Sequence, residues 1–115
     1  MQKVAMFVFN GSPLCFVHVL LNALDMHERG DDVQIVMEGE ATQLVAELSK
    51  PDNWLNSLWQ KDREENLVAG ACKACSQKLG VRQAIEAHGL AFLDDMSGHP
   101  GMAAFRDRGY DIITF

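Results

Sequence analysis

Residues 67–75, LVAGACKAC, decide the fold that this sequence predicts. Residues 67–71 form a short apolar run typical of a buried strand, and a helical pattern begins directly after it. Cys72 and Cys75 therefore stand where a strand ends and a helix begins. In an open α/β sheet, ligands collect at the carboxyl ends of the strands, and the amino terminus of a helix favours a thiolate over a thiol. The cysteine pair therefore indicates a reactive site rather than a packing feature.

Apolar runs of strand length recur on both sides of this stretch, and helical patterns separate them. Strands are predicted over residues 3–9, 33–37, 67–71, 90–93 and 110–115. Helical segments are predicted over residues 14–29, 41–49, 54–59, 73–79, 81–88 and 102–108. With right-handed crossovers, this alternation gives a mostly parallel five-stranded sheet between two helical layers. We therefore expect residues 1–115 to form a single three-layer α/β/α domain.

The turn Asn10-Gly11-Ser12 follows the first strand, and Pro13 suits the first position of the next helix. Asn10, Gly11 and Ser12 could present backbone amides to an anion or to a flavin phosphate. The turn lacks the GxGxxG fingerprint and a P-loop lysine, so we predict no bound cofactor. The helix that follows is apolar on more than one stripe, so part of it packs inside the monomer or faces another subunit.

The balance of 16 acidic against 10 basic residues gives a net charge of −6, which argues against nucleic acid as a partner. No amino-terminal segment has the pattern of a signal peptide. The longest apolar stretch, residues 14–24, is too short to span a bilayer. Three cysteines are an odd number, which disfavours a disulfide framework. We therefore expect a cytoplasmic protein with reduced thiols and no membrane span.

Cys72 is the predicted nucleophile, because it follows the strand directly and has Lys73 beside it and Lys78 farther along the helix. We expect these surroundings to lower the pKa of its thiol. Cys75 lies one helical turn away, where it could form a disulfide with Cys72 or resolve a persulfide or sulfenate on it. In the alternative interpretation, both cysteines are small buried residues at the start of a helix. Cys15, inside an apolar helix, is expected in the core.

His99 follows the fourth strand and should open at the same edge of the sheet as Cys72. It could hydrogen-bond to the thiolate or act as a general acid or base, and the alternative is that it caps the last helix. Cys72, Cys75, His88 and His99 also have the residue types of a zinc site. A second CxxC or a close histidine pair is missing, so the sequence predicts no metal site.

The chain resembles the DsrE/DsrF-like family of small cytoplasmic α/β proteins, which includes sulfur-relay subunits of the TusD kind. The resemblance rests on the opening strand with its Asn10-Gly11 turn, on residues 68–72, on the Met96-Ser97-Gly98-His99 loop and on the closing residues 108–115. It implies a five-stranded parallel sheet, assembly into trimers or hexamers and, in the sulfur-relay branch, a persulfide carried on one cysteine. By matching position that cysteine is Cys72, and Cys75 is a departure from the relay pattern.

Taken together, these patterns predict an intracellular sulfur carrier or sulfurtransferase that uses a persulfide at Cys72. Cys75 would assist release, and His99 would position or protonate the leaving group. A donor protein and an acceptor protein are the expected partners, and a homo-oligomer is the expected assembly. Two alternatives remain open: a non-catalytic oligomeric module that binds a small molecule, and a dithiol redox switch formed by Cys72 and Cys75.

Overall fold

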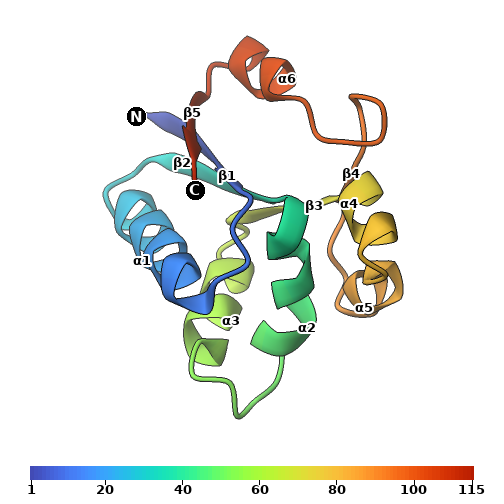
Figure 1. The fold of residues 1–115 in the computed structure, drawn as a ribbon. Helices are drawn as coiled ribbons and strands as arrows, with labels where there is room; N and C mark the ends of the chain where they lie inside the picture. The colour runs from blue at the N-terminus through green and yellow to red at the C-terminus, as the bar shows by residue number, and fades with distance from the viewer.

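All 115 residues are described by the computed structural model, in which five strands form one sheet in the order β4-β3-β2-β1-β5 (Figure 1). Every pair of neighbouring strands is parallel. The strands are β1 Lys3–Val8, β2 Asp32–Met37, β3 Val68–Cys72, β4 Phe92–Leu93 and β5 Asp111–Thr114. The helices are α1 Pro13–Glu28, the 3-10 helix η1 Gly39–Gln43, α2 Leu44–Leu48, α3 Asn56–Glu64, α4 Lys73–Lys78, α5 Arg82–Ala87 and α6 Met102–Asp107. The predicted alternation of strands and helices is confirmed.

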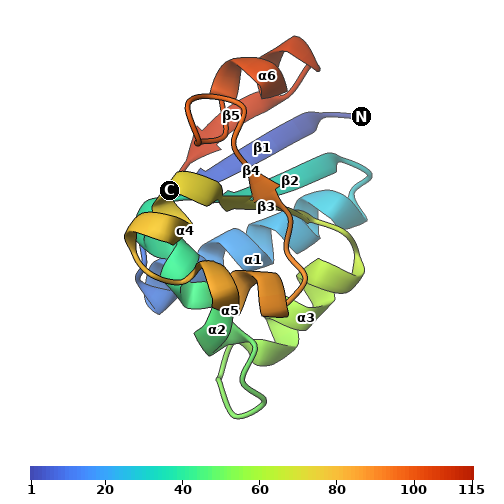
Figure 2. The same cartoon turned by 90° about the vertical axis from the view of Figure 1, so that its right-hand side faces the viewer.

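The two faces of the sheet are covered unequally, as Figure 2 shows. One face packs against apolar residues from α1, η1, α2, α3 and α5, which together form the main core. On the other face lies α6, whose Phe105 packs against Phe7 with ring centroids 5.4 Å apart. The fold is therefore a three-layer α/β/α sandwich, as the sequence predicts, and one of its outer layers is the single helix α6.

Helix α1 begins with Pro13 at its first turn, as expected, but its apolar surface is only partly buried. Leu14 is 71% exposed and Leu21 is 48% exposed. The prediction that Cys15 lies in the core is wrong, because α1 directs Phe16 and the residues in register with it to the sheet and leaves Cys15 in solvent. The monomer therefore leaves two large apolar side chains of this helix, Leu14 and Leu21, uncovered.

The predicted helix over residues 41–49 begins instead as the 3-10 helix η1 and continues as the short helix α2. Gly39 has a φ of +52°, and its carbonyl accepts a 2.7 Å hydrogen bond from the hydroxyl of Thr42. This tight turn starts immediately after β2. It places Glu38 between the end of the strand and the start of the turn, at the edge of the sheet.

All strands point the same way, so the residues that follow β2, β3 and β4 meet at one edge of the sheet. Met37 pairs with Ala71, and Cys72 pairs with Leu93. Gly70 makes the last pairing feasible, since a Cβ there would lie 2.5 Å from the carbonyl oxygen of Ala91. The register therefore brings Glu38, Cys72 and the chain after Leu93 together. None of the helices has the length and apolar character needed to cross a membrane.

Candidate functional site

Cys72 is the last residue of β3 and the N-cap of α4. Its Sγ accepts a hydrogen bond from the backbone N–H of Cys75 at 3.3 Å. Its carbonyl accepts a 2.6 Å hydrogen bond from the hydroxyl of the buried Ser76. The predicted position at a junction of strand and helix is confirmed, and these hydrogen bonds fix the thiol there. Cys72 has no exposed surface.

His99 closes a tight turn that packs against α4. Met96 and His99 exchange two backbone hydrogen bonds of 2.7 and 2.9 Å, and Ser97 and Gly98 between them have φ values of 51° and 90°. Positive φ at both central residues is typical of a type I′ turn and favours glycine at the second position. The N–H of Ala74 donates to the carbonyl of Gly98 at 2.8 Å, which ties the turn to the first turn of α4.

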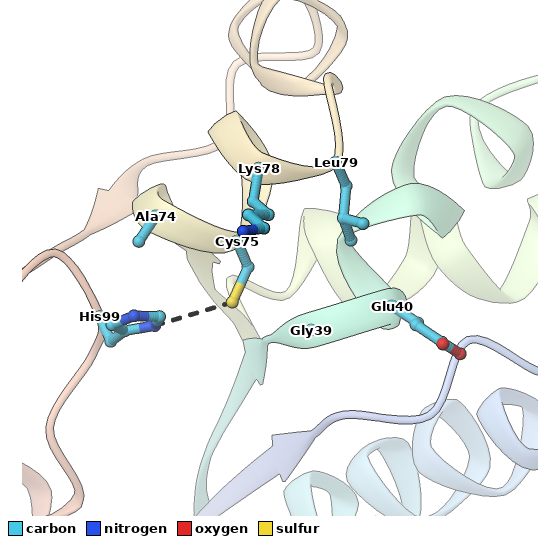
Figure 3. Close-up of a pocket in the computed structure, with 7 residues that line it drawn as sticks. All are labelled: Gly39, Glu40, Ala74, Cys75, Lys78, Leu79 and His99. Atoms are coloured by element: carbon cyan, nitrogen blue, oxygen red, sulfur yellow. Dashed lines mark hydrogen bonds between the residues drawn. The ribbon is translucent and has the colours of Figure 1, made fainter.

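The imidazole of His99 contacts both cysteines of the CxxC pair. Its Nδ1 lies 3.1 Å from Sγ of Cys72 and 3.7 Å from Sγ of Cys75. Figure 3 shows the side chains of Cys75 and His99 pointing toward one another across the pocket. The expected contact between His99 and Cys72 is therefore present, and the two thiols share one imidazole nitrogen.

Glu38 is the fourth member of the cluster and is not among the site residues predicted from the sequence. One side-chain donor atom from each of Glu38, Cys72, Cys75 and His99 lies within 4.8 Å of the others. His88, considered above as a ligand with the cysteines, follows α5 and is not in this cluster. Glu38 directly follows the strand predicted over residues 33–37, so it carried the same positional signal as Cys72. That Glu38 lies next to the end of β3 depends on the strand order, which the sequence pattern alone does not predict.

Burial controls the charges of the cluster. Burial raises the pKa of Cys72 to about 12. The hydrogen bond from the Cys75 N–H lowers this pKa by a smaller amount, and the nearby Cys75 thiol and Glu38 carboxyl raise it. Burial also raises the pKa of Glu38 to about 7. The expectation of a lowered pKa at Cys72 is therefore wrong, because desolvation outweighs the helix terminus. Lys73 does not reach the sulfur and instead pairs with Asp94 at 3.7 Å.

Two pockets open on either side of His99. The first has a volume of about 330 Å³ and is lined by Cys75, Lys78 and His99 among others (Figure 3). The second has a volume of about 490 Å³ and is lined by Glu38, His99 and several apolar residues. Solvent therefore reaches the cluster from the Cys75 side and from the Glu38 side. Cys72 lines neither pocket.

The turn of Asn10, Gly11 and Ser12 lies near this edge but outside both pockets. Gly11 packs so closely on Glu40 that an added Cβ would lie 3.0 Å from the Glu40 Cβ. The N–H of Ser12 donates to Oδ1 of Asn10 at 2.7 Å, so that amide is already bonded. Anion binding at this turn stays a prediction.

No family model matches the chain. It is 33% identical to the uncharacterized protein MJ0733 of Methanocaldococcus jannaschii over 97% of this chain and 94% of that protein. An uncharacterized protein of Archaeoglobus fulgidus is 37% identical over 36% of this chain and 67% of its own length.

A solved structure has the same fold. It is that of a conserved protein of unknown function, BT1422, from Bacteroides thetaiotaomicron, with a TM-score of 0.73 and 18% sequence identity. The alignment covers 99% of this chain and 95% of that one. At this identity the likeness concerns the fold. The identity of 33% to MJ0733 over nearly the whole length of both chains shows a family relationship. The chain belongs to the family of the Methanocaldococcus jannaschii protein MJ0733.

Proposed function

We propose that this protein is a carrier of sulfane sulfur, and that its accessible thiol, Cys75, accepts the sulfur. The observation that carries this proposal is the pairing of a thiol on an open pocket with a second thiol and an imidazole in contact range. The sequence alone favours Cys72 as the carrying cysteine. The burial of Cys72 favours Cys75 as the thiol that meets a donor, with Cys72 as the inner partner.

The transfer is an exchange between a thiolate and a persulfide. The thiolate of Cys75 attacks the outer sulfur of a donor R–S–SH, a new S–S bond forms, and the donor S–S bond breaks. The electron pair leaves with R–S⁻, which takes up a proton. His99 lies beside the reacting sulfur and can deliver that proton. Lys78 lines the same pocket, and its ammonium favours an anionic sulfur species there.

Release to an acceptor follows the same chemistry in the other direction. An acceptor thiolate attacks the outer sulfur of the Cys75 persulfide, and the Cys75 thiolate leaves. Donor and acceptor must reach Cys75 through the first pocket. The second pocket shares His99 with it, and the surface around this second pocket suits contact with a protein partner. Phe9, Met96 and Met102 line that pocket and are exposed, although they are large and apolar.

This proposal includes a relationship with the DsrE/DsrF-like proteins and an intracellular, cytoplasmic setting. It is supported by the five-stranded parallel sheet, by the cysteine that ends β3 and by the turn of residues 96–99. We also propose a homo-oligomer, a trimer or hexamer, that covers the apolar face of α1 formed by Leu14 and Leu21. A reducing compartment keeps the thiols free for sulfur exchange.

Peptide-level mass spectrometry after exposure of the reduced protein to polysulfide tests the proposal. A Cys15→Ser background removes the exposed cysteine on α1, and Cys72→Ser and Cys75→Ser are compared in it. We expect one added sulfur atom at Cys75, loss of that sulfur in Cys75→Ser, and its transfer to an added acceptor thiol. Addition that persists unchanged in Cys75→Ser would overturn the assignment of Cys75.

A dithiol redox switch is the second candidate, because the two sulfurs of the CxxC pair lie within 4.8 Å of each other and both are free. Equilibration in glutathione buffers of graded potential tests it. A switch gives a Cys72–Cys75 disulfide whose potential lies in the range of the cytosolic glutathione pool. Absence of that disulfide under oxidising buffers would exclude the switch and leave the sulfur-carrier proposal standing.

A further inference from the structure

We propose that Glu38, Cys72, Cys75 and His99 form a four-ligand site for a zinc ion. The cluster offers one carboxylate oxygen, two thiolate sulfurs and one imidazole nitrogen, which come from the ends of β2 and β3, from α4 and from the turn beyond β4. This inference goes beyond sulfur carriage and does not depend on it.

The distances suit a tetrahedral ion. With Zn–S bonds of about 2.3 Å and Zn–N or Zn–O bonds of about 2.0–2.2 Å, neighbouring ligand atoms lie about 3.3–3.8 Å apart. Nδ1 of His99 is 3.1 Å from one sulfur and 3.7 Å from the other. All four donor atoms lie within 4.8 Å of one another, so small side-chain movements close the set around one ion.

The chemical nature of the donors selects the metal. Two thiolates with an imidazole favour a borderline-soft ion and disfavour calcium and magnesium, which prefer sets of oxygen ligands. A single carboxylate completes the set without changing that preference. Zinc takes such mixed four-ligand sets, and it carries no redox chemistry that would oxidise the thiols.

Glu38 gives independent support, because no protein group pairs with its carboxyl group beside the two thiols and the imidazole. Its residue is 6% exposed, and its carboxyl group takes part in none of the hydrogen bonds or ion pairs of the chain. Glu38 also lines the second pocket, so a cation that enters from that side meets a largely desolvated carboxyl that no protein cation neutralises. The nearby acidic groups differ in this respect, since Asp94 pairs with Lys73 and Asp95 accepts a hydrogen bond from the Gly101 N–H.

The protein also holds the ligands in place before an ion arrives. Cys72 is held by the Cys75 N–H, and the turn that carries His99 is tied to α4 through Ala74 and Gly98. Pockets on two sides of His99 give an ion access to the cluster. A zinc ion bound there would engage the sulfur of Cys75, so zinc and sulfane sulfur would compete for the same thiol.

Titration of the metal-free, reduced protein with zinc alone tests the site without any sulfur donor. Competition with a chromophoric chelator gives the stoichiometry and the affinity. We expect one zinc ion per chain. Cobalt(II) in place of zinc should give the thiolate charge-transfer and tetrahedral ligand-field bands that report two coordinated cysteines.

Four single variants and two controls define the ligands. Glu38→Gln, Cys72→Ser, Cys75→Ser and His99→Asn should each weaken zinc affinity at least about tenfold. The controls are Glu40→Gln, next to the cluster in the first pocket, and His88→Asn, the histidine that the structure leaves outside it. Both controls should bind zinc as the wild type does. Circular dichroism of the metal-free variants checks that each is folded.

Zinc binding should also raise the melting temperature of the wild type in proportion to the logarithm of zinc concentration. Absence of stoichiometric binding to the wild type would overturn the site, and so would equal affinity in folded Glu38→Gln and His99→Asn. Neither result bears on sulfur loading, which is measured on metal-free protein. A protein that binds zinc but accepts no sulfur would retain this site and lose the proposed function.

Discussion

Nδ1 of His99 lies 3.1 Å from Sγ of Cys72, although 27 positions separate the two residues in the chain. Two local features produce this contact. Cys72 ends β3 beside Leu93, and the turn after β4 folds back until the carbonyl of Gly98 accepts a hydrogen bond from Ala74. The imidazole therefore covers the buried thiol while its Nδ1 stays within 3.7 Å of the accessible thiol of Cys75.

Alkylation should distinguish the three cysteines of the native protein. Cys15 is exposed, Cys75 is half-buried on a pocket, and Cys72 is buried. With iodoacetamide we expect modification of Cys15 and Cys75, and modification of Cys72 slower than both by at least about tenfold, since a buried thiol must wait for local opening. Mass spectrometry of timed samples gives the rates. If Cys72 reacts as fast as Cys75 in the native protein, its thiol is accessible to solvent and the burial described above is contradicted.

Gly98→Ala should impair the site more than the stability of the fold. Alanine at a φ of +90° costs about 1 kcal/mol, and its Cβ would lie 3.2 Å from the Cβ of Ala74. The turn must shift, and His99 must shift with it. We expect a loss of about 1–3 kcal/mol in the free energy of unfolding, measured by urea denaturation, together with reduced sulfur acceptance at Cys75.

Gly30→Ala is the matched control for this change. Gly30 has a φ of +97° and no atom within 4 Å of an added Cβ, so the substitution introduces similar backbone strain far from the site. It should lower stability by about 1 kcal/mol and leave sulfur acceptance unchanged. Equal loss of sulfur acceptance in both variants would mean that the position of the turn is not what matters.

Asp62 should make the protein less stable as the pH rises. Its carboxyl group is buried without a hydrogen-bond partner, and burial raises its pKa to about 8, partly offset by Lys61. The folded state therefore holds the proton more tightly than the unfolded chain, whose aspartate has a pKa of about 3.9. The resulting stability is complete below about pH 4 and is lost as the pH rises toward 8.

Asp62→Asn removes this titration. Relative to the wild type, the variant should gain stability as the pH rises from about 4 to 8, by up to about 1.4 kcal/mol for each pH unit. Urea denaturation at several pH values measures the difference. Glu64→Gln, at an exposed position of the same helix, should keep the wild-type slope. A slope that Asp62→Asn leaves unchanged would show that water or a neighbour satisfies the carboxylate.

The exposed face of α1 should mediate self-association. Replacing Leu14 and Leu21 together by lysine should shift the sedimenting species from a trimer or hexamer toward the monomer, because a buried interface does not accept two charges. Trp54→Lys is the control, as Trp54 is 61% exposed elsewhere on the surface. A wild-type protein that sediments as a monomer at every concentration would remove the oligomer from the proposal.

Much of the fold follows from local patterns. The run before Cys72, the turn after residue 9 and the glycines that end helices each predict an element that the structure contains, because strand and helix periodicity are local properties. The burial of an individual side chain is harder to predict from the sequence, because it depends on contacts with distant residues. Cys15 is in solvent and Cys72 is buried, and neither result could be read from the residues next to them.

The sequence predicts three of the four residues of the cluster, because their positions follow from local patterns. Cys72 and His99 each follow a predicted strand, and Cys75 lies one helical turn after Cys72, so the sequence predicts that the three meet at one edge of the sheet. Glu38 also follows a strand, but its place in the cluster depends on the pairing of Met37 with Ala71 and so on strand order. Strand order is a global property that alternation alone does not determine. The raised pKa of Cys72 likewise depends on how deeply the folded chain covers it.

The most direct measurement of sulfur carriage compares two cysteines of one molecule. The reduced, metal-free wild type is exposed briefly to a limiting amount of polysulfide, and mass spectrometry of its peptides gives the persulfide fractions at Cys75 and at Cys15. Cys15 reports the reactivity of an exposed thiol that lies outside the cluster of Glu38, Cys72, Cys75 and His99. The proposed function predicts a several-fold excess of sulfur at Cys75, which an added acceptor thiol then removes. Equal loading of Cys75 and Cys15, or no loading at Cys75, would contradict it.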